Sequence, residues 1–334
     1  MQECILPKVP KKMLGISILR IIATLAVFAV HFGQRMGLSG ILHTISNAGQ
    51  YGVQLFFIIS GFLLVKSLDR CHDRHDFYQY CIKKGVRLLT LYYLIVLWYF
   101  LTETFIFHSI VPDPYHLGWL RYIFLLNGIV PANCYLWSNV GITWTIPIFA
   151  MAYLITPLWY KLIKTKYTET LSCAFLVSIL LYFFTDTILN GWLSFFNYYY
   201  SFIGGMLICK AIQEKKIALA QAGTASLLFA LLILDSMFVV SLTLIFMLIV
   251  SFVYDFTLPQ GKLAILINEL DKYSYTMYLG HGIIFCSILD KFAIVWPLRA
   301  CIAVFGSIAL TWILYNCYEK HVTKFLQKKF LEKK

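Results

Sequence analysis

Charged side chains are scarce in this chain of 334 residues. Aspartate and glutamate together number only 16, and all charged residues make up 13% of the sequence, whereas 60% of it is hydrophobic. The mean hydropathy is +0.74, and soluble domains usually carry about twice this share of charge. The composition therefore excludes an ordinary soluble domain and predicts a membrane protein with several spans.

The sequence also lacks the usual marks of metal sites, disulfide frameworks and linkers. Its nine cysteines are scattered and include no Cys-x-x-Cys pair, so they predict small apolar side chains and neither a zinc site nor a disulfide framework. We find no internal repeat, low-complexity tract or proline-rich linker. We therefore expect residues 1–334 to form a single membrane domain without a metal.

Long apolar runs predict the fold class, an all-α integral membrane bundle of about ten transmembrane helices. A further apolar segment, residues 115–136, is predicted to be re-entrant or interfacial, because counting it as a span would move the lysines after residue 160 to the other side. The predicted spans are 14–33, 52–68, 88–108, 141–160, 169–187, 192–210, 217–234, 236–254, 273–292 and 296–316.

Basic residues favour one orientation of this bundle. With both termini in the cytoplasm, Lys8, Lys11, Lys12 and the cluster 70–87 all lie inside, as the positive-inside rule requires. Anionic lipid headgroups are a sufficient partner for the net charge of +12, so we expect no nucleic acid partner. The first apolar run lacks a convincing cleavage site and predicts an uncleaved span.

Two polar residues interrupt the first predicted span. Arg20 and His31 are eleven residues apart, which is about three helical turns, so both project from one face roughly 16 Å apart. Polar groups at membrane depth usually face a protein interior or a hydrated cavity and usually serve a function. The structural alternative is that Arg20 reaches toward one interface and His31 ends the helix at the other.

Basic residues also stand at the start of the third predicted span. Lys83 and Arg87 lie one helical turn apart, beside Lys84, and could converge on a nucleotide phosphate or simply anchor the helix at the cytoplasmic interface. In the second predicted span, Ser60 and Gly61 favour close helix packing.

The fourth and ninth predicted spans carry the remaining candidates. Trp144 begins the fourth span, in which Pro147 and Pro157 each remove a backbone hydrogen bond, and broken membrane helices often border a cavity. Tyr278 and His281 lie three residues apart on one face of the ninth span. Such a histidine is a hydrogen-bonded core residue at least as often as a catalyst.

Taken together, these segments resemble the acyltransferase-3 family, whose members are integral membrane acyltransferases that typically O-acetylate cell-surface glycans from cytoplasmic acyl-CoA. The resemblance runs nearly from end to end. It rests on the Arg20 and His31 spacing, FFIISGFLL at 56–64, KKGVR at 83–87, WTIPIFAMAYLITP at 144–157, SYTMYLGH at 274–281 and YEKHVTKF at 318–325.

The resemblance implies roles for particular residues. His31 would be catalytic and Arg20 essential, while Arg20, Lys84 and Arg87 would contact acetyl-CoA or another acyl-CoA, which is the donor and the only cofactor expected. A bacterial plasma membrane is the implied location. The implied partners are a glycan acceptor, which could be lipid-linked, the membrane lipids and a possible second copy of the chain.

Three further residues are candidates for the substrate side, namely Trp144, Tyr278 and His281. This chain departs from the family pattern at Phe149 and Ala150, where many relatives carry glutamate. That departure makes a carboxylate-assisted mechanism at this point doubtful.

The chemistry implied for His31 has two forms, general-base activation of a sugar hydroxyl or covalent relay of the acyl group. Asp186 and Asp290 are the carboxylates we favour for orienting its ring, while Glu103, Asp113 and Asp235 also lie near span ends. Two other classes of function stay open, a transporter or flippase of lipid-linked saccharide and a non-catalytic partner in glycan assembly.

Overall fold

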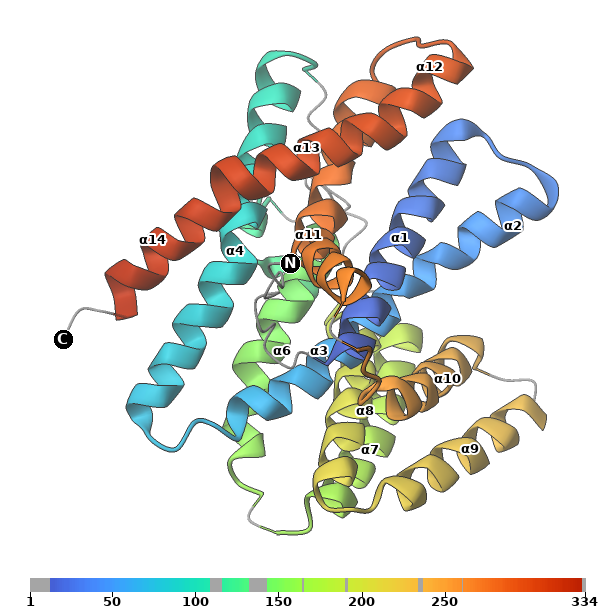
Figure 1. Cartoon of the computed structure of the whole chain (residues 1–334), viewed down its shortest axis with the longest axis vertical. Coiled ribbons are helices and arrows are strands. Elements are labelled where there is room, and N and C mark those ends of the chain that lie inside the picture. The colour runs from blue at the N-terminus through green and yellow to red at the C-terminus, as the bar shows by residue number, and fades with distance from the viewer. Residues whose placement is uncertain are drawn as a thin grey trace, which may run out of the picture.

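The structure is a computed structural model that describes residues 13–108, 116–131, 143–163, 165–189, 192–233, 237–259 and 261–331. Within these ranges the chain is helical and contains no β-strand (Figure 1). The lysines predicted at the cytoplasmic N-terminus, together with Asp113 and Asp235, lie outside the described residues.

Fourteen α-helices account for most of the described chain. Two 3-10 turns (Gly49–Tyr51 and Leu126–Gly128) and three π-helical segments (Ile283–Leu289, Ile302–Gly306 and Leu314–Glu319) join or extend them. The α-helices are α1 (Leu14–Met36), α2 (Gly40–Ala48), α3 (Gly52–Leu68), α4 (Arg74–Phe105), α5 (Leu120–Ile123), α6 (Thr145–Tyr160), α7 (Tyr167–Thr187), α8 (Phe196–Gln213), α9 (Ile217–Ile233), α10 (Phe238–Val253), α11 (Lys262–Gly282), α12 (Trp296–Cys301), α13 (Ser307–Ile313) and α14 (Lys320–Leu331).

Local sequence signals mark the ends of several helices. Asp73 precedes α4 and its carboxylate accepts a hydrogen bond of 2.7 Å from the backbone N–H of Asp76, which is an N-cap. Gly37 ends α1 with a φ of 62°, a left-handed conformation that glycine adopts without strain. Pro147 lies in the first turn of α6 and Pro157 lies inside it, yet α6 is continuous, so the predicted break does not occur.

Each predicted span overlaps a helix, but helix length differs between them. Within the described residues, five helical stretches are long and apolar enough to cross a membrane, and α6, α9 and α10 are shorter apolar helices. The chain is therefore a multi-pass membrane protein, while the count of ten spans stays a prediction. The described part of the segment 115–136 contains only the four-residue helix α5 and a 3-10 turn, so it forms no spanning helix.

Helix α3 lies at the centre of the bundle and packs most extensively on α8. A Cβ added at Gly61 would lie 2.0 Å from the carbonyl oxygen of Phe202, and one added at Gly205 would lie 1.9 Å from that of Ile58. Only glycine permits so close an approach of two helices. The packing role predicted for Gly61 is thus confirmed, and α3 and α8 form a rigid support for the helices around them.

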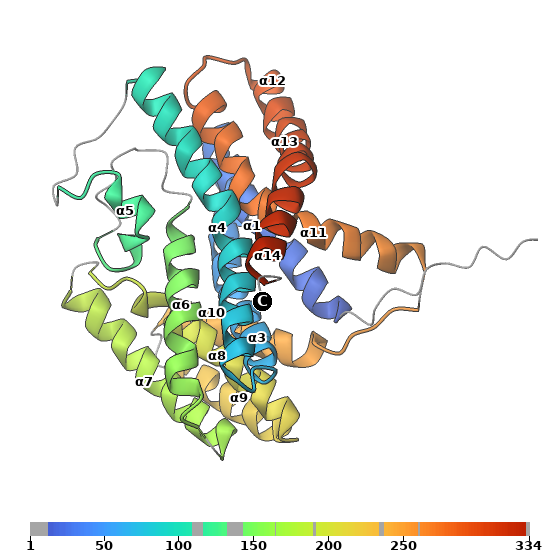
Figure 2. The same cartoon turned by 90° about the vertical axis from the view of Figure 1, so that its left-hand side faces the viewer.

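Helix α1 packs against both α3 and α11, which brings the start and the last third of the chain together (Figures 1 and 2). Helices α7, α8, α9 and α10 gather at one end of the molecule, and α4, α13 and α14 lie at the other side (Figure 1). Many large apolar side chains on the outer helices are exposed, among them Leu25, Leu158 and Phe229. Such surfaces suit contact with lipid tails.

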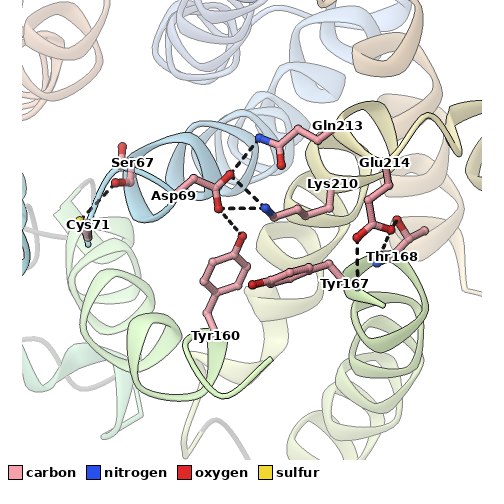
Figure 3. A network of polar contacts seen from close by, with 9 residues as sticks. All are labelled: Ser67, Asp69, Cys71, Tyr160, Tyr167, Thr168, Lys210, Gln213 and Glu214. Carbon is pink, nitrogen blue, oxygen red and sulfur yellow. Dashed lines mark hydrogen bonds and ion pairs between the residues drawn. The ribbon is translucent and has the colours of Figure 1, made fainter. Parts of the chain in front are cut away.

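A polar network holds α3, α6, α7 and α8 together at one end of the bundle (Figure 3). Asp69 accepts hydrogen bonds from Lys210 at 2.9 Å, Gln213 at 2.9 Å and Tyr160 at 2.8 Å. Glu214 accepts hydrogen bonds from the first turn of α7. Burial alone would raise the pKa of Glu214, but hydrogen bonds from Thr168 and from a lysine keep it below its ordinary value.

Candidate functional site

Arg20 of α1 forms an ion pair with a carboxylate of α11. Its Nη2 lies 2.6 Å from Oδ2 of Asp271, and Ser17 donates a hydrogen bond of 3.0 Å to the same oxygen. The Asp271 side chain is only 3% exposed. A carboxylate buried to this degree requires a cation and hydrogen-bond donors, so Arg20 and Asp271 stabilise each other inside the bundle.

A cavity of about 130 Å³ opens beside this ion pair. We call it the arginine cavity, because it brings together Arg20, Lys84 and Arg87, the three residues predicted to contact the donor. Asp271 also lines it. Three cationic side chains around one carboxylate leave an excess of positive charge, which favours binding of an anion such as a phosphate.

Helix α4 presents two of these cations. Lys84 and Arg87 lie three residues apart on the face that borders the cavity, and the Lys84 ammonium stands 4.8 Å from the ring centre of Tyr153. Lys83 instead donates a hydrogen bond of 3.0 Å to Gln79 and is exposed to solvent. The convergence predicted for residues 83 and 87 is thus made by residues 84 and 87.

A second and larger cavity, of about 480 Å³, borders the other polar residue of α1. We call it the histidine cavity, because His31 lines it together with Trp144 and Tyr278. Neutral amides and one carboxylate account for much of its polar lining. They are Gln34, Gln50, Gln54, Asn197 and Asp186.

Tyr278 lines both cavities. Its hydroxyl is hydrogen-bonded to the hydroxyl of Thr145 at 2.7 Å, and its ring packs against Phe56 with the ring centres 5.2 Å apart. The side chain is 5% exposed. Tyr278 therefore stands where the arginine cavity and the histidine cavity approach each other.

His281 lies elsewhere than Tyr278, although both belong to α11. It is 1% exposed and is not among the lining residues of either cavity. Its ring centre is 5.3 Å from that of His31, and aromatic rings of Phe28 and Phe285 pack around it. Residues three apart on a helix differ in direction by about 60°, so Tyr278 faces the cavities while His281 faces α1.

The two carboxylates favoured for orienting His31 differ in their surroundings. Asp290 is paired with arginines, 3.0 Å from Arg35 and 3.8 Å from Arg299. Asp186, near the end of α7, lines the histidine cavity together with His31. The third candidate, Glu103, is paired with a lysine at 2.9 Å. Among the described residues, no three histidine, cysteine or acidic side chains gather closely enough to hold a metal ion.

Phe149 and Ala150, at which the sequence departs from the family pattern, are packed inside the bundle. Phe149 lines the arginine cavity, and its ring centre lies 4.8 Å from that of Phe57 and 5.5 Å from that of Phe202. Ala150 is buried. An aromatic and an alanine therefore occupy this turn of α6.

Asp271 was not among the predicted site residues, because the ninth predicted span begins at residue 273. A signal was present, because residues 271, 274, 275 and 278 follow helical spacing and all four line the arginine cavity. Ser60 was predicted to pack between helices, whereas it also lines this cavity. The helix that contains Asp271 begins at Lys262, eleven residues before the predicted start of the span.

Comparison with known proteins identifies the fold family. The sequence model of the acyltransferase-3 family, described as an acyltransferase domain, matches residues 13–316. ORF330 of Acidianus two-tailed virus, whose name describes it as an acetyltransferase, is 34% identical over 119 residues, which cover 36% of this chain and 33% of the viral protein. No solved structure shows significant similarity to the chain. Since the family model spans nearly all helices that build the two cavities, the chain belongs to the acyltransferase-3 family of membrane proteins.

Proposed function

We propose that this protein transfers an acetyl group from acetyl-CoA to a hydroxyl group of a glycan on the cell surface or on a lipid carrier. One observation carries the proposal. A cationic cavity and a polar cavity that contains His31 and no lysine or arginine approach each other at Tyr278, a residue that lines both. A transferase with an anionic donor and an uncharged acceptor needs two sites of these kinds.

The arginine cavity suits the donor. Arg20, Lys84 and Arg87 offer guanidinium and ammonium groups, and coenzyme A carries a diphosphate and a further phosphate. Arginine binds phosphate oxygens through paired N–H groups, whereas lysine acts as a point charge. A cavity of about 130 Å³ has room for the phosphates or the pantetheine arm and not for the whole coenzyme, so the remainder would lie outside it.

The histidine cavity suits the acceptor. Side-chain amides of Gln34, Gln54 and Asn197 both donate and accept hydrogen bonds, which matches the hydroxyl groups of a sugar. Trp144, whose ring centre lies 4.8 Å from that of Tyr198 with the two rings tilted by 48°, offers an aromatic face of the kind on which sugar rings rest. The lining includes one carboxylate and no lysine or arginine, which favours an uncharged acceptor.

His31 would perform the transfer. In the direct route its ring nitrogen takes the proton of the sugar hydroxyl while the hydroxyl oxygen attacks the thioester carbonyl carbon. The carbon–sulfur bond then breaks, and the thiolate of coenzyme A leaves and takes up the proton from His31. In the covalent route the ring nitrogen attacks the thioester carbonyl carbon and the thiolate of coenzyme A leaves. The sugar oxygen then takes the acetyl group from the ring nitrogen while its proton goes to that thiolate.

This proposal includes an orientation. Acyl-CoA is made in the cytoplasm, so the arginine cavity would open toward the cytoplasm and the histidine cavity toward the outer side. Both termini would then be cytoplasmic, in the plasma membrane of a bacterium. The basic residues of the loop before α4 agree with this side for the arginine cavity.

A direct test uses the purified protein in lipid nanodiscs with radiolabelled acetyl-CoA and glycan from the source cell. We expect labelled acetate on the glycan, and we expect His31→Ala to lower the rate by about 10²–10⁴-fold, the usual contribution of general acid–base catalysis. His43→Ala is the matched control, because His43 is exposed on α2 outside both cavities. Movement of lipid-linked sugar across liposomes without acetyl-CoA would instead favour a transporter.

A further inference from the structure

The His31 ring has a buried side and a side toward the histidine cavity. Its Nδ1 has no solvent exposure and no hydrogen-bond partner, while the residue lines the cavity. Gln34, which also lines the cavity, is a hydrogen-bond partner of the ring, and because Nδ1 has none this contact falls on Nε2. Nε2 is therefore the nitrogen that a substrate hydroxyl would reach by replacing Gln34. A base whose other nitrogen is not held can rotate or change tautomer, which lowers its efficiency.

The neighbour of this buried side is His281. Its Nδ1 lies 2.9 Å from the backbone carbonyl oxygen of Met277. A carbonyl oxygen only accepts hydrogen bonds, so Nδ1 of His281 must carry a proton. In the neutral ring the other nitrogen, Nε2, then holds a lone pair and acts as an acceptor.

That acceptor is itself unused and buried. Nε2 of His281 has no solvent exposure and no hydrogen-bond partner, and the ring centres of His281 and His31 are 5.3 Å apart. The two neighbouring imidazoles thus have one unpaired buried nitrogen each, and the rings of Phe28 and Phe285 pack around His281. Unpaired polar atoms at such a place are costly, and a small rotation of His31 would pair them.

We propose that His281 is the positioning residue of His31, accepting a hydrogen bond from Nδ1–H of His31 and so keeping Nε2 of His31 unprotonated toward the histidine cavity. The proposal rests on the function proposed above. It assigns to a histidine the part that a carboxylate takes in Ser-His-Asp enzymes, where the third residue fixes the tautomer of the base. Asp290 is not available for this part because two arginines hold it.

The helix changes type directly after His281. The α-helix ends at Gly282 and continues as a π-helical segment from Ile283 to Leu289. Such π segments are frequent at functional sites. The hydrogen bond to the Met277 carbonyl fixes the direction of the His281 ring.

Three substitutions at position 281 separate positioning from packing. His281→Gln can place an acceptor near the former Nε2, His281→Asn can keep the donation to Met277 but loses that acceptor, and His281→Phe keeps the aromatic packing alone. We expect His281→Asn and His281→Phe to lower kcat for acetyl transfer about 10- to 100-fold, with KM for acetyl-CoA unchanged and with thermal unfolding of His281→Phe close to that of the wild type. We expect His281→Gln to recover a substantial part of kcat.

A second measurement does not depend on activity. Nitrogen-15 spectra of histidine-labelled protein in nanodiscs report the tautomer of each ring, and His31→Asn identifies the signals of His31. We expect the Nδ1–H form in the wild type and a shift toward the Nε2–H form, which unconstrained imidazoles favour, in His281→Phe. A wild type without any acetyl transfer would refute the proposed function alone. An unchanged tautomer, equal kcat in all three variants, or a loss that follows thermal stability would overturn the positioning role.

Discussion

The arginine cavity and the histidine cavity share helix α1 but differ in nearly every property that decides binding. The former measures about 130 Å³ and holds three cations beside one carboxylate, whereas the latter measures about 480 Å³ and is lined by amides, aromatic rings and a histidine. One helix thus supplies residues to two chemically different cavities. In the proposed function, charge would select the anionic donor at Arg20, and hydrogen bonds with shape would select the uncharged acceptor at His31.

The way each key residue is held differs as well. Arg20 is fixed by a direct ion pair of 2.6 Å to Asp271, while His31 has an unpaired buried nitrogen beside another histidine. A direct ion pair suits a group that binds, because its geometry should not change. For His31, the hydrogen bond to His281 proposed above would supply the fixation that a base needs.

The largest expected effect on donor binding comes from removing the charges of α4. In the double variant Lys84→Gln with Arg87→Gln, we expect KM for acetyl-CoA to rise by roughly 10- to 100-fold or more, because a hydrogen bond to a charged group contributes about 1.5–3 kcal/mol. The maximal rate should change much less. Steady-state kinetics at two salt concentrations measure this, since the remaining charge attraction should weaken with salt.

Lys83→Gln is the matched control for that variant. Lys83 is adjacent in sequence to Lys84 but is exposed and bonded to Gln79, so KM should stay at the wild-type value. An equal rise of KM in the control would mean that charge at the membrane surface, and not the arginine cavity, attracts the donor. The arginine cavity would then not be the donor site.

How far the sequence alone could lead is clear from particular residues. Arg20, Lys84 and Arg87 were predicted together, and the structure places all three around one cavity. For Arg20 the signal was local, a charge inside an apolar run, but the grouping with Lys84 rested on the family resemblance, since spacing alone had paired residues 83 and 87. Of the catalytic and substrate-side candidates, His31, Trp144 and Tyr278 line the other cavity, and His281 does not.

The rest depended on contacts between distant parts of the chain. Asp271 pairs with a residue 251 positions away, and the neighbour of His31 across the helix contact is 250 positions away in sequence, at His281. Helical periodicity describes one helix at a time and cannot say which faces meet. For the same reason Asp290 was expected to orient His31, although Arg35 and Arg299 hold it in the structure.

A smaller effect is expected where the two cavities approach each other. Tyr278→Phe removes the hydrogen bond to Thr145. We expect the rate of acetyl transfer to fall about fivefold, which corresponds to about 1 kcal/mol for a typical hydrogen bond. Tyr278→Ala removes the ring that packs on Phe56. In this variant the preference for acetyl-CoA over butyryl-CoA should fall by about tenfold or more, within the range that one or two methylene groups contribute to selectivity.

The measurement is a competition assay with both acyl donors present and the acylated glycan analysed by mass spectrometry. Phe56→Leu is a useful companion, because it alters the same contact from the other side and should relax the donor preference less than Tyr278→Ala. Selectivity that is unchanged in Tyr278→Ala would show that acyl groups meet His31 by a path that avoids Tyr278. The two cavities would then be unconnected in the reaction.

The smallest effect on catalysis is expected in the polar network around Asp69, which borders neither cavity (Figure 3). Asp69→Asn leaves Lys210, which is 10% exposed, with a neutral partner, and we expect the free energy of unfolding to fall by roughly 1–3 kcal/mol. Both KM values and kcat should remain at wild-type levels. Thermal unfolding in nanodiscs, followed together with acetyl transfer, measures both quantities.

The exposed pair of Lys216 and Glu169, 2.7 Å apart, provides the control for this last variant. Glu169→Gln should leave thermal unfolding close to that of the wild type, because water screens a surface ion pair. A fall in kcat of Asp69→Asn under conditions in which the variant remains folded would contradict the expectation that this network serves stability alone. It would mean that the end of the bundle formed by α3, α6 and α8 takes part in the reaction, since these helices also carry Phe56, Phe149 and Asn197 to the two cavities.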